Sequence, residues 1–241
     1  MQLYIIRHAQ STNNALADPR ERDCDPTLTD LGERQADALA RHLAAGVELV
    51  PPISTTNGRD QQGYYFTRLY CSPMWRALQT ADSIGQALGL TPEVWADIHE
   101  QGGIYLDHQD GRGPIGYPGK TRQEIQTVFP RCVLPEDVTD RGWWNRDYED
   151  WPACHERAAR VAEEIRAWAD RDGRDDECIA FVSHGGFADA LLKALFDQSA
   201  DRGLFYYHYN TAISRIEFRD DGRLNVRYLN RVDHLPSELV S

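Results

Sequence analysis

The chain has 241 residues, of which 41% are hydrophobic and 27% are charged, and its formal net charge is −12. This length and composition predict one well-cored domain and exclude a disordered or collagen-like chain. No apolar run approaches the roughly 20 residues that a membrane span needs. The negative charge argues against nucleic acid and anionic membranes as partners, because no basic patch is evident in the sequence.

The five cysteines are an odd number without a C-x-x-C pair, which fits neither a disulfide framework nor a zinc knuckle. The N-terminal residues do not form a basic leader followed by an apolar stretch, so no secretion signal is expected. These features predict a reducing, cytoplasmic setting. Only two of the 26 basic residues are lysines, so nearly all positive charge is arginine, which suits two-point binding of oxyanions.

The first part of the chain predicts strands that alternate with helices. An apolar run at 3–6 stops at Arg7, which indicates a strand that ends in a loop. Apolar residues at helical spacing then predict a helix from Thr29 or Asp30 to about Gly46. The stretch 51–63 is polar and rich in helix breakers, so we interpret it as a long loop.

A second strand is predicted at 66–71, followed by a helix that ends at Gly89. Residues 101–150 hold many glycines and prolines, with one short helix expected near 122–129, and we interpret them as an insertion that caps the main sheet. Its aromatic group is Trp143, Trp144, Tyr148 and Trp151. These rings are typical of side chains that pack an insertion, and a dimer interface is an equal alternative.

The last part of the chain predicts a long amphipathic helix over 158–168, a buried strand at 178–182 and a helix from Gly186. Strands at 213–218 and 224–229 flank a turn and predict a hairpin. This order predicts a three-layer α/β sandwich, in which a mostly parallel sheet has helices on both faces, an antiparallel edge strand and an inserted cap. We expect the whole chain, 1–241, to form this single domain.

Reactive side chains come directly after three of the predicted strands. Arg7 and His8 follow the first, Ser72 and Arg76 follow the second, and His184 follows the strand at 178–182. Because an open α/β sheet binds ligands beyond the carboxyl ends of its strands, we expect two imidazoles and two guanidiniums at one edge. Two arginines suit a dianion such as phosphate, and a neutral imidazole is a suitable nucleophile towards phosphorus.

These residues resemble the histidine phosphatase superfamily, the phosphoglycerate mutase-like proteins. The motifs that carry the resemblance lie at 7–11 (RHAQS) with Asn14, 28–36, 72–77 (SPMWRA) with Thr80, 183–186 (SHGG) and 210–211. The resemblance covers about 1–46, 66–100 and 155–230. The chain departs from the family pattern at Ala9 and Gln10, where the family often has Gly and Glu.

The resemblance implies that His8 is the nucleophile that becomes phosphorylated. It also implies a phosphate pocket formed by Arg7, Arg76 and His184, with Gly185 as a further substrate-binding residue, and the helix starts that follow these loops add backbone N–H donors. This arrangement needs no metal ion and no cofactor, because cationic side chains stabilise the charge of the phosphoryl group.

The resemblance implies two further roles. Asn14 matches a family position that hydrogen-bonds the transferred phosphoryl group. The proton donor is an acidic residue at the start of the insertion, which points to Glu100, with Asp97 as the alternative. True mutases of the family usually carry Asn at the position of Gly186, so this chain resembles the phosphatases more closely.

The sequence therefore predicts a histidine acid-type phosphatase that hydrolyses phosphomonoesters through phosphohistidine at His8, with a phosphorylated small molecule or a phosphoprotein as substrate. The alternatives are a phosphoglycerate mutase-type phosphotransferase and a non-catalytic phosphate-binding adaptor. A metal-dependent hydrolase is a further alternative, because five ligand-type residues lie within 99–110. The sequence leaves open the identity of the substrate and whether the protein forms a homodimer.

Overall fold

The computed structural model describes residues 1–46, 64–171, 177–200 and 203–241, so the loop predicted at 51–63 lies outside the described residues. The main sheet contains β1 (Gln2–Arg7), β2 (Arg68–Cys71), β3 (Pro92–Val94), β6 (Cys178–Ser183), β7 (Ile213–Phe218) and β8 (Leu224–Arg231). A second sheet pairs β4 (Tyr105–Asp107) with β5 (Pro114–Gly116). The α-helices are α1 (Asp30–Ala45), α2 (Trp75–Leu88), α3 (Arg122–Val128), α4 (Trp151–Ala169) and α5 (Gly185–Leu195). Single 3₁₀ turns cover Thr12–Asn14, Pro19–Glu21, Ala96–Ile98 and Ser237–Leu239.

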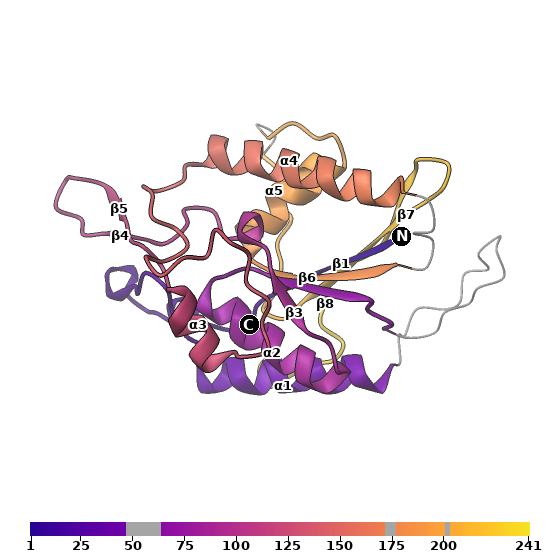
Figure 1. Ribbon diagram of the computed structural model, residues 1–241, viewed down its shortest axis with the longest axis horizontal. Coiled ribbons are helices and arrows are strands. Elements are labelled where there is room, and N and C mark those ends of the chain that lie inside the picture. The colour runs from indigo at the N-terminus through magenta and orange to yellow at the C-terminus, as the bar shows by residue number, and fades with distance from the viewer. Residues whose placement is uncertain (47–63, 172–176, 201–202) are drawn as a thin grey trace.

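The strand order of the main sheet is β3-β2-β6-β1-β7-β8. The strands β3, β2, β6 and β1 run parallel, whereas β7 is antiparallel to β1 and β8 is antiparallel to β7. Figure 1 shows α4 and α5 over one face of this sheet and α1 and α2 over the other. The predicted three-layer sandwich with a mostly parallel sheet and an antiparallel edge is therefore confirmed.

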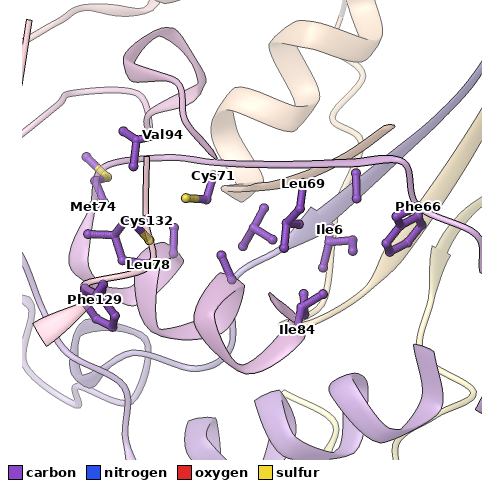
Figure 2. Packing of buried hydrophobic residues seen from close by; sticks show 14 of the residues in the cluster. Ile6, Phe66, Leu69, Cys71, Met74, Leu78, Ile84, Val94, Phe129 and Cys132 are labelled. Carbon is purple, nitrogen blue, oxygen red and sulfur yellow. The ribbon is translucent and has the colours of Figure 1, made fainter. Parts of the chain in front are cut away.

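The alternation of side chains along β1 explains why both faces of the sheet are covered. Leu3 and Ile5 are buried in the cluster under α4 and α5, whereas Tyr4 and Ile6 are buried in the cluster under α1 and α2. A strand that buries both faces has a continuous apolar run rather than an alternating one, as the sequence of β1 has. Figure 2 shows part of the second cluster, in which Leu69 of β2 faces Leu78 and Ile84 of α2.

The helix ends are determined by the local sequence. The Thr29 side chain accepts a hydrogen bond from the Gly32 N–H and caps α1, whose end is a left-handed residue at Gly46. The helix α2 ends in the same way at Gly89. At its start, however, α2 has no side-chain cap of its own, because its N-cap residue is Met74. The free N–H groups of α2 therefore depend on a partner from elsewhere in the chain.

The structure differs from the sequence prediction in three places. The three-residue strand β3 and the β4–β5 hairpin were not predicted, because their short, proline- and glycine-containing segments have no readable period. The helix α4 begins at Trp151, well before the first periodic apolar residue, because Asp150 caps it and Pro152 suits its first turn. Of the predicted aromatic group, Trp143 and Trp144 are buried, whereas Trp151 is 40% exposed.

Candidate active site

The parallel register brings the two predicted imidazoles together. Arg7 at the end of β1 lies opposite Ser183 at the end of β6, so His8 and His184 leave the sheet side by side. Their ring centroids are 5.0 Å apart, and both rings are buried. Ser72 comes directly after β2 at the same edge, and its Oγ lies 2.8 Å from Nε2 of His184. The sequence prediction of one common edge is in agreement with this geometry.

The hydrogen bonds of His8 fix its tautomer. Nε of Arg76 donates to Nε2 of His8 over 3.0 Å, and a guanidinium has only donors, so Nε2 is the nitrogen without a proton. Nδ1 then carries the proton and donates to the Ala9 carbonyl over 2.6 Å. Burial, with smaller effects from Arg76 and Arg7, lowers the pKa of His8 well below its usual value. The ring is therefore neutral and has its lone pair on Nε2.

Arg76 is the second residue of α2 and is buried beside His8. Burial lowers the pKa of Arg76 to about 10, while the charges of Asp25 and Glu100 oppose this shift. The guanidinium thus stays positive at neutral pH. Thr80 connects the first turn of α2 to the loop after β1, because its Oγ1 accepts the Ala9 N–H and donates to the Arg76 carbonyl.

Arg7 contributes a second guanidinium, which is partly buried. Its Nη1 donates to the His208 carbonyl over 2.6 Å, while its Nε has no hydrogen-bond partner within the described ranges. A Cβ atom placed on Gly185 would lie 3.5 Å from this Nε, so the unpaired N–H lies next to the first turn of α5. Burial lowers the pKa of Arg7, and Glu100 and Tyr207 oppose the shift. An unpaired guanidinium N–H beside a helix N-terminus suits an anion.

His184 is the N-cap residue of α5 and is fully buried. Burial, with a smaller contribution from Arg76, lowers the pKa of His184 well below its usual value. The Ser72 hydroxyl that meets its Nε2 also accepts the Met74 N–H over 3.3 Å. Nδ1 of His184 is buried and unpaired in the part of the chain that the structure describes. Like the Arg7 Nε, this atom is suited to a ligand.

The Glu100 carboxylate lies on the first turn of α5. Its Oε1 accepts the N–H groups of Gln101 and Phe187, each over 2.9 Å, and its Oε2 accepts the Gly186 N–H over 3.2 Å. Glu100 also acts electrostatically on both Arg7 and Arg76. Its position is therefore within the cationic cluster, at a helix end that favours negative charge.

The alternative acid, Asp97, lies elsewhere. It belongs to the 3₁₀ turn Ala96–Ile98, and its charge helps to raise the pKa of Glu164 on α4, after the larger effect of burial on Glu164. Asp97 therefore acts on the α4 side of the molecule, whereas Glu100 acts on Arg7 and Arg76. Of the two carboxylates, Glu100 is therefore the one that lies among the arginines of this site.

Asn14 reaches the site through a second asparagine. Its Oδ1 accepts hydrogen bonds from the N–H and hydroxyl of Ser11, each over 3.0 Å, and a longer one of 3.4 Å from Nδ2 of Asn210. Nδ2 of Asn210 also donates to the His8 carbonyl over 2.9 Å. Asn210 was part of the sequence motif, but its contact with the backbone of the nucleophile was not predicted.

Thr211 has a left-handed backbone conformation with φ of 59°. This conformation is rare for a β-branched residue and occurs where the surroundings impose it. Here the Thr211 N–H donates to the carbonyls of Arg7 and His8 over 3.1 and 3.3 Å. Through these hydrogen bonds, Thr211 holds the backbone of Arg7 and His8 in place.

A buried ion pair holds the segment that carries Glu100. Nε and Nη2 of Arg157 donate to the two carboxylate oxygens of Glu149 over 2.8 and 2.5 Å. Nη1 of Arg157 donates to the carbonyls of Asp97 and His99 over 2.6 and 3.1 Å. The guanidinium thus connects α4 to both sides of the turn that leads into Glu100. Nothing in the sequence pattern indicated this role for Arg157.

The residues of the metal-site alternative do not form a site. His99 is buried against Trp143 and Trp144, while Asp107 and Asp110 are exposed on the β4–β5 hairpin. Among the residues that the structure describes, no group of three or more His, Cys, Asp or Glu side chains is placed to hold a metal ion. Separately, none of the described helices has the length and apolar character needed to cross a bilayer.

Acidification should destabilise the fold through histidines whose pKa is lowered in the folded state, and the half-buried His234 is one of them. His234 lies 3.0 Å from the Thr211 hydroxyl, and burial lowers its pKa to about 4 from a usual 6.5. Between these two pH values the unfolded state binds a proton that the folded state does not, so the free energy of unfolding falls as the pH falls. One such histidine lowers the free energy of unfolding by about 1 kcal/mol between pH 7 and pH 5.5.

Urea unfolding of the wild type, His234→Asn and His108→Asn at these two pH values checks this expectation. His108 is exposed on the hairpin and is the matched control. On acidification, we expect the free energy of unfolding of His234→Asn to fall by about 1 kcal/mol less than that of the wild type. That of His108→Asn should fall by as much as that of the wild type. Asp25 opposes the trend in all three proteins, because burial raises its pKa to about 6. Equal losses in all three proteins would contradict the assignment.

The sequence matches a family model, and the fold matches solved structures. The sequence profile of the histidine phosphatase superfamily (branch 1) matches residues 3–231. No curated protein matches the sequence significantly. A phosphoserine phosphatase from Entamoeba histolytica, solved with phosphoserine, is 18% identical with a TM-score of 0.59, over 98% of this chain and 99% of its own.

Two further solved structures have the same fold. A mycobacterial glucosyl-3-phosphoglycerate phosphatase, solved with VO3, is 17% identical with a TM-score of 0.59, over 96% of this chain and 99% of its own. YhfR from Bacillus stearothermophilus is 22% identical with a TM-score of 0.59, over 97% of this chain and 98% of its own. These likenesses are in the fold, and the profile match extends over nearly the whole sequence. The chain therefore belongs to the histidine phosphatase superfamily, as its motifs had predicted.

Proposed function

We propose that the protein is a phosphatase that transfers the phosphoryl group of a phosphomonoester to Nε2 of His8 and then to water, without a metal ion. The observation that carries this proposal is the hydrogen bond from Arg76 to Nε2, which leaves that nitrogen unprotonated in a buried site. A neutral imidazole whose other nitrogen is bound to a carbonyl is oriented for nucleophilic attack.

In the first step, Nε2 of His8 attacks phosphorus, the N–P bond forms and the P–O bond to the alcohol breaks. Charge on the three equatorial oxygens is stabilised by Arg7 and Arg76, whose guanidiniums are already in place. Arg76 loses its acceptor when Nε2 is phosphorylated, and its Nε then donates to a phosphoryl oxygen. Nδ1 keeps its bond to the Ala9 carbonyl, which stabilises the positive ring.

His184 and the start of α5 complete the phosphate site. His184 is neutral without a ligand, and a bound dianion favours its protonated form, so that it donates from the unpaired Nδ1. The Gly185 N–H lies in the first turn of α5, where no earlier helical carbonyl is available to it. Asn14 donates its amide N–H groups to the same phosphoryl group in this proposal.

Glu100 is the proton donor to the leaving alkoxide. Its Oε1 is occupied by two backbone N–H groups, whereas Oε2 accepts only the longer contact from Gly186, so we assign the proton to Oε2. In the second step the Glu100 carboxylate takes a proton from water, and the oxygen of that water attacks phosphorus. The N–P bond breaks, its electron pair returns to Nε2, and Arg76 donates to that nitrogen again.

Gly186 favours hydrolysis over a mutase reaction. A Cβ atom at this position would lie 2.7 Å from Oε1 of Glu100. The Asn that mutases of the family usually carry here therefore requires another position of the acid. The glycine leaves the carboxylate close to α5, where it is available to a water molecule after the alcohol has left.

We further propose that the substrate is a phosphorylated small molecule and that 101–150 form a cap beside the phosphate site within the single domain 1–241. Solved neighbours are a phosphoserine phosphatase and a glucosyl-3-phosphoglycerate phosphatase, which supports small phosphate esters. A net charge of −12 disfavours nucleic acid. The five free thiols suit the reducing cytoplasm.

Phosphate release from phenyl phosphate in excess EDTA tests the central proposal. We expect the wild type to stay active, and His8→Ala to lose at least about 1000-fold in kcat, because no other side chain replaces the nucleophile. Rapid alkaline quenching during turnover should reveal a protein mass increased by one phosphoryl group in the wild type alone. Activity that EDTA removes, or that His8→Ala retains, would contradict the mechanism.

Gly186→Ala tests the position of Glu100 without removing it. The added methyl displaces the flexible carboxylate, so we expect kcat on an alkyl phosphate to fall by about 10- to 100-fold. Stability in urea should stay within about 1 kcal/mol of the wild type, because alanine suits a helix better than glycine.

A double-mutant cycle with Glu100→Gln supplies the control. If Gly186 acts through Glu100, adding Gly186→Ala to the Glu100→Gln variant produces little further loss of kcat. A loss as large as in the wild-type background would show that Gly186→Ala acts on the phosphate site itself.

A further inference from the structure

A cavity of about 690 Å³ has no role in the chemistry described above. Its walls come from the 3₁₀ turn Pro19–Glu21 with the residue that follows it, from the β4–β5 hairpin and from Tyr148, and the side chains used below are Arg22, Tyr105 and Tyr148. Its size is within the range of small-molecule sites. Figure 1 shows the hairpin extending from the sheet on the side of α3.

Arg22 is a guanidinium that has no anionic partner among the residues that the structure describes. Its Nε is buried and has no hydrogen-bond partner in the described ranges. Its Cζ lies 4.6 Å from the centroid of the Tyr105 ring, which fixes the plane of the side chain. Two other arginines near the cavity differ, because Arg20 is paired with Asp18 and Arg112 with Asp110. A buried N–H that lacks an acceptor is costly unless a ligand supplies one.

Arg22 faces the catalytic groups as well as the cavity. Its charge lowers the pKa of Arg76, after the larger effect of burial, which places the two guanidiniums within electrostatic reach. Tyr105 is linked to the same centre, because the charges of Glu100 and Arg76 both act on the pKa of its hydroxyl. The segment that carries Arg22 is also held at the start of α2, because Asp25 accepts the Trp75 N–H over 2.9 Å and Arg76 is the next residue of that helix.

The tyrosine wall is preorganised and connected to the proton donor. The rings of Tyr105 and Tyr148 meet edge to face with centroids 4.6 Å apart. Gly102 lies under them, and a Cβ atom there would be 2.3 Å from the Tyr105 ring. Nε2 of Gln101 donates to the Tyr148 hydroxyl over 2.8 Å, while the Gln101 N–H binds Glu100. The tyrosine wall of the cavity is therefore connected to Glu100 through the neighbouring residue Gln101.

We infer that this cavity binds the leaving alcohol, and that the preferred substrates are phosphomonoesters whose alcohol carries a second anionic group, a carboxylate or a phosphate, at Arg22. The carbon body of the alcohol packs against Tyr105 and Tyr148. The remaining charged groups of the cavity are at its outer wall, where Asp107 accepts the Gln109 N–H and His108 bonds the Tyr117 hydroxyl. This inference rests on the proposed phosphatase function.

The test compares kcat/KM for phenyl phosphate, carboxyphenyl phosphate and an alkyl bisphosphate in the wild type and Arg22→Gln. We expect the wild type to prefer the two esters with a second anion, and Arg22→Gln to lose about 10- to 100-fold on them while phenyl phosphate changes by less than about 3-fold. The carboxylate and bisphosphate arms show which anion Arg22 prefers. Arg112→Gln is the control, because it removes an equal charge from an exposed, paired arginine outside the cavity.

Two results would overturn the subsite. The first is that the preference for a second anion persists in Arg22→Gln. The second is that kcat/KM falls equally for all three esters, which would show that Arg22 acts on the transferred phosphoryl group through Arg76. A failure of the proposed function looks different, because no ester would then show turnover that depends on His8.

Discussion

The hydrogen bond from Arg76 to His8 is the interaction on which the rest of the site depends. It selects the tautomer of His8, because a guanidinium donates hydrogen bonds and cannot accept them. The bond can form over 3.0 Å because Arg76 is in the first turn of α2, next to His8. That position of α2 is not secured by its own N-cap. Asp25, from a loop 50 residues earlier, accepts the Trp75 N–H over 2.9 Å and so holds the start of the helix. Its second oxygen is buried and unpaired among the described residues.

Burial gives this cluster its chemical character. Arg7 and Arg76 are desolvated, both imidazoles are held neutral, and the carboxylates of Asp25 and Glu100 compensate part of the positive charge. A phosphoryl dianion that enters meets donors that need no reorganisation, in surroundings where each charge interaction is stronger than in water. The strain at Thr211 and the unpaired N–H of Arg7 belong to the same arrangement, because both are maintained by the fold before a ligand binds.

The sequence predicted those parts of the site that depend on local pattern and on one topological rule. Short apolar strands that end at Arg7, Ser72 and His184 were readable, and parallel strands bring the residues at their carboxyl ends to one edge of the sheet. The choice between Glu100 and Asp97 was not readable, because they are three residues apart and a 3₁₀ turn directs them to different sides. The hydrogen bond from Arg157 to the Asp97 carbonyl joins residues 60 positions apart. It was not readable either, because its acceptor is a backbone atom and the spacing of side chains does not indicate such a contact. The strand β3 and the β4–β5 hairpin were missed for the same reason, since pairing with distant segments defines them rather than their own composition.

The residues proposed to perform the reaction and those proposed to select the substrate lie in different parts of the structure. His8, Arg76 and His184 lie directly after strand ends or begin a helix packed on the sheet, so their positions are tied to the buried core. Arg22 and Tyr105 come instead from a loop and a two-stranded hairpin that lie outside the main sheet. Substitutions in these outer segments change the leaving-group cavity without disturbing the register that joins β1 to β6. In the proposed function, the same core therefore suits different substrates, because the groups at the sheet edge are proposed to bind only the phosphoryl group that all of them share.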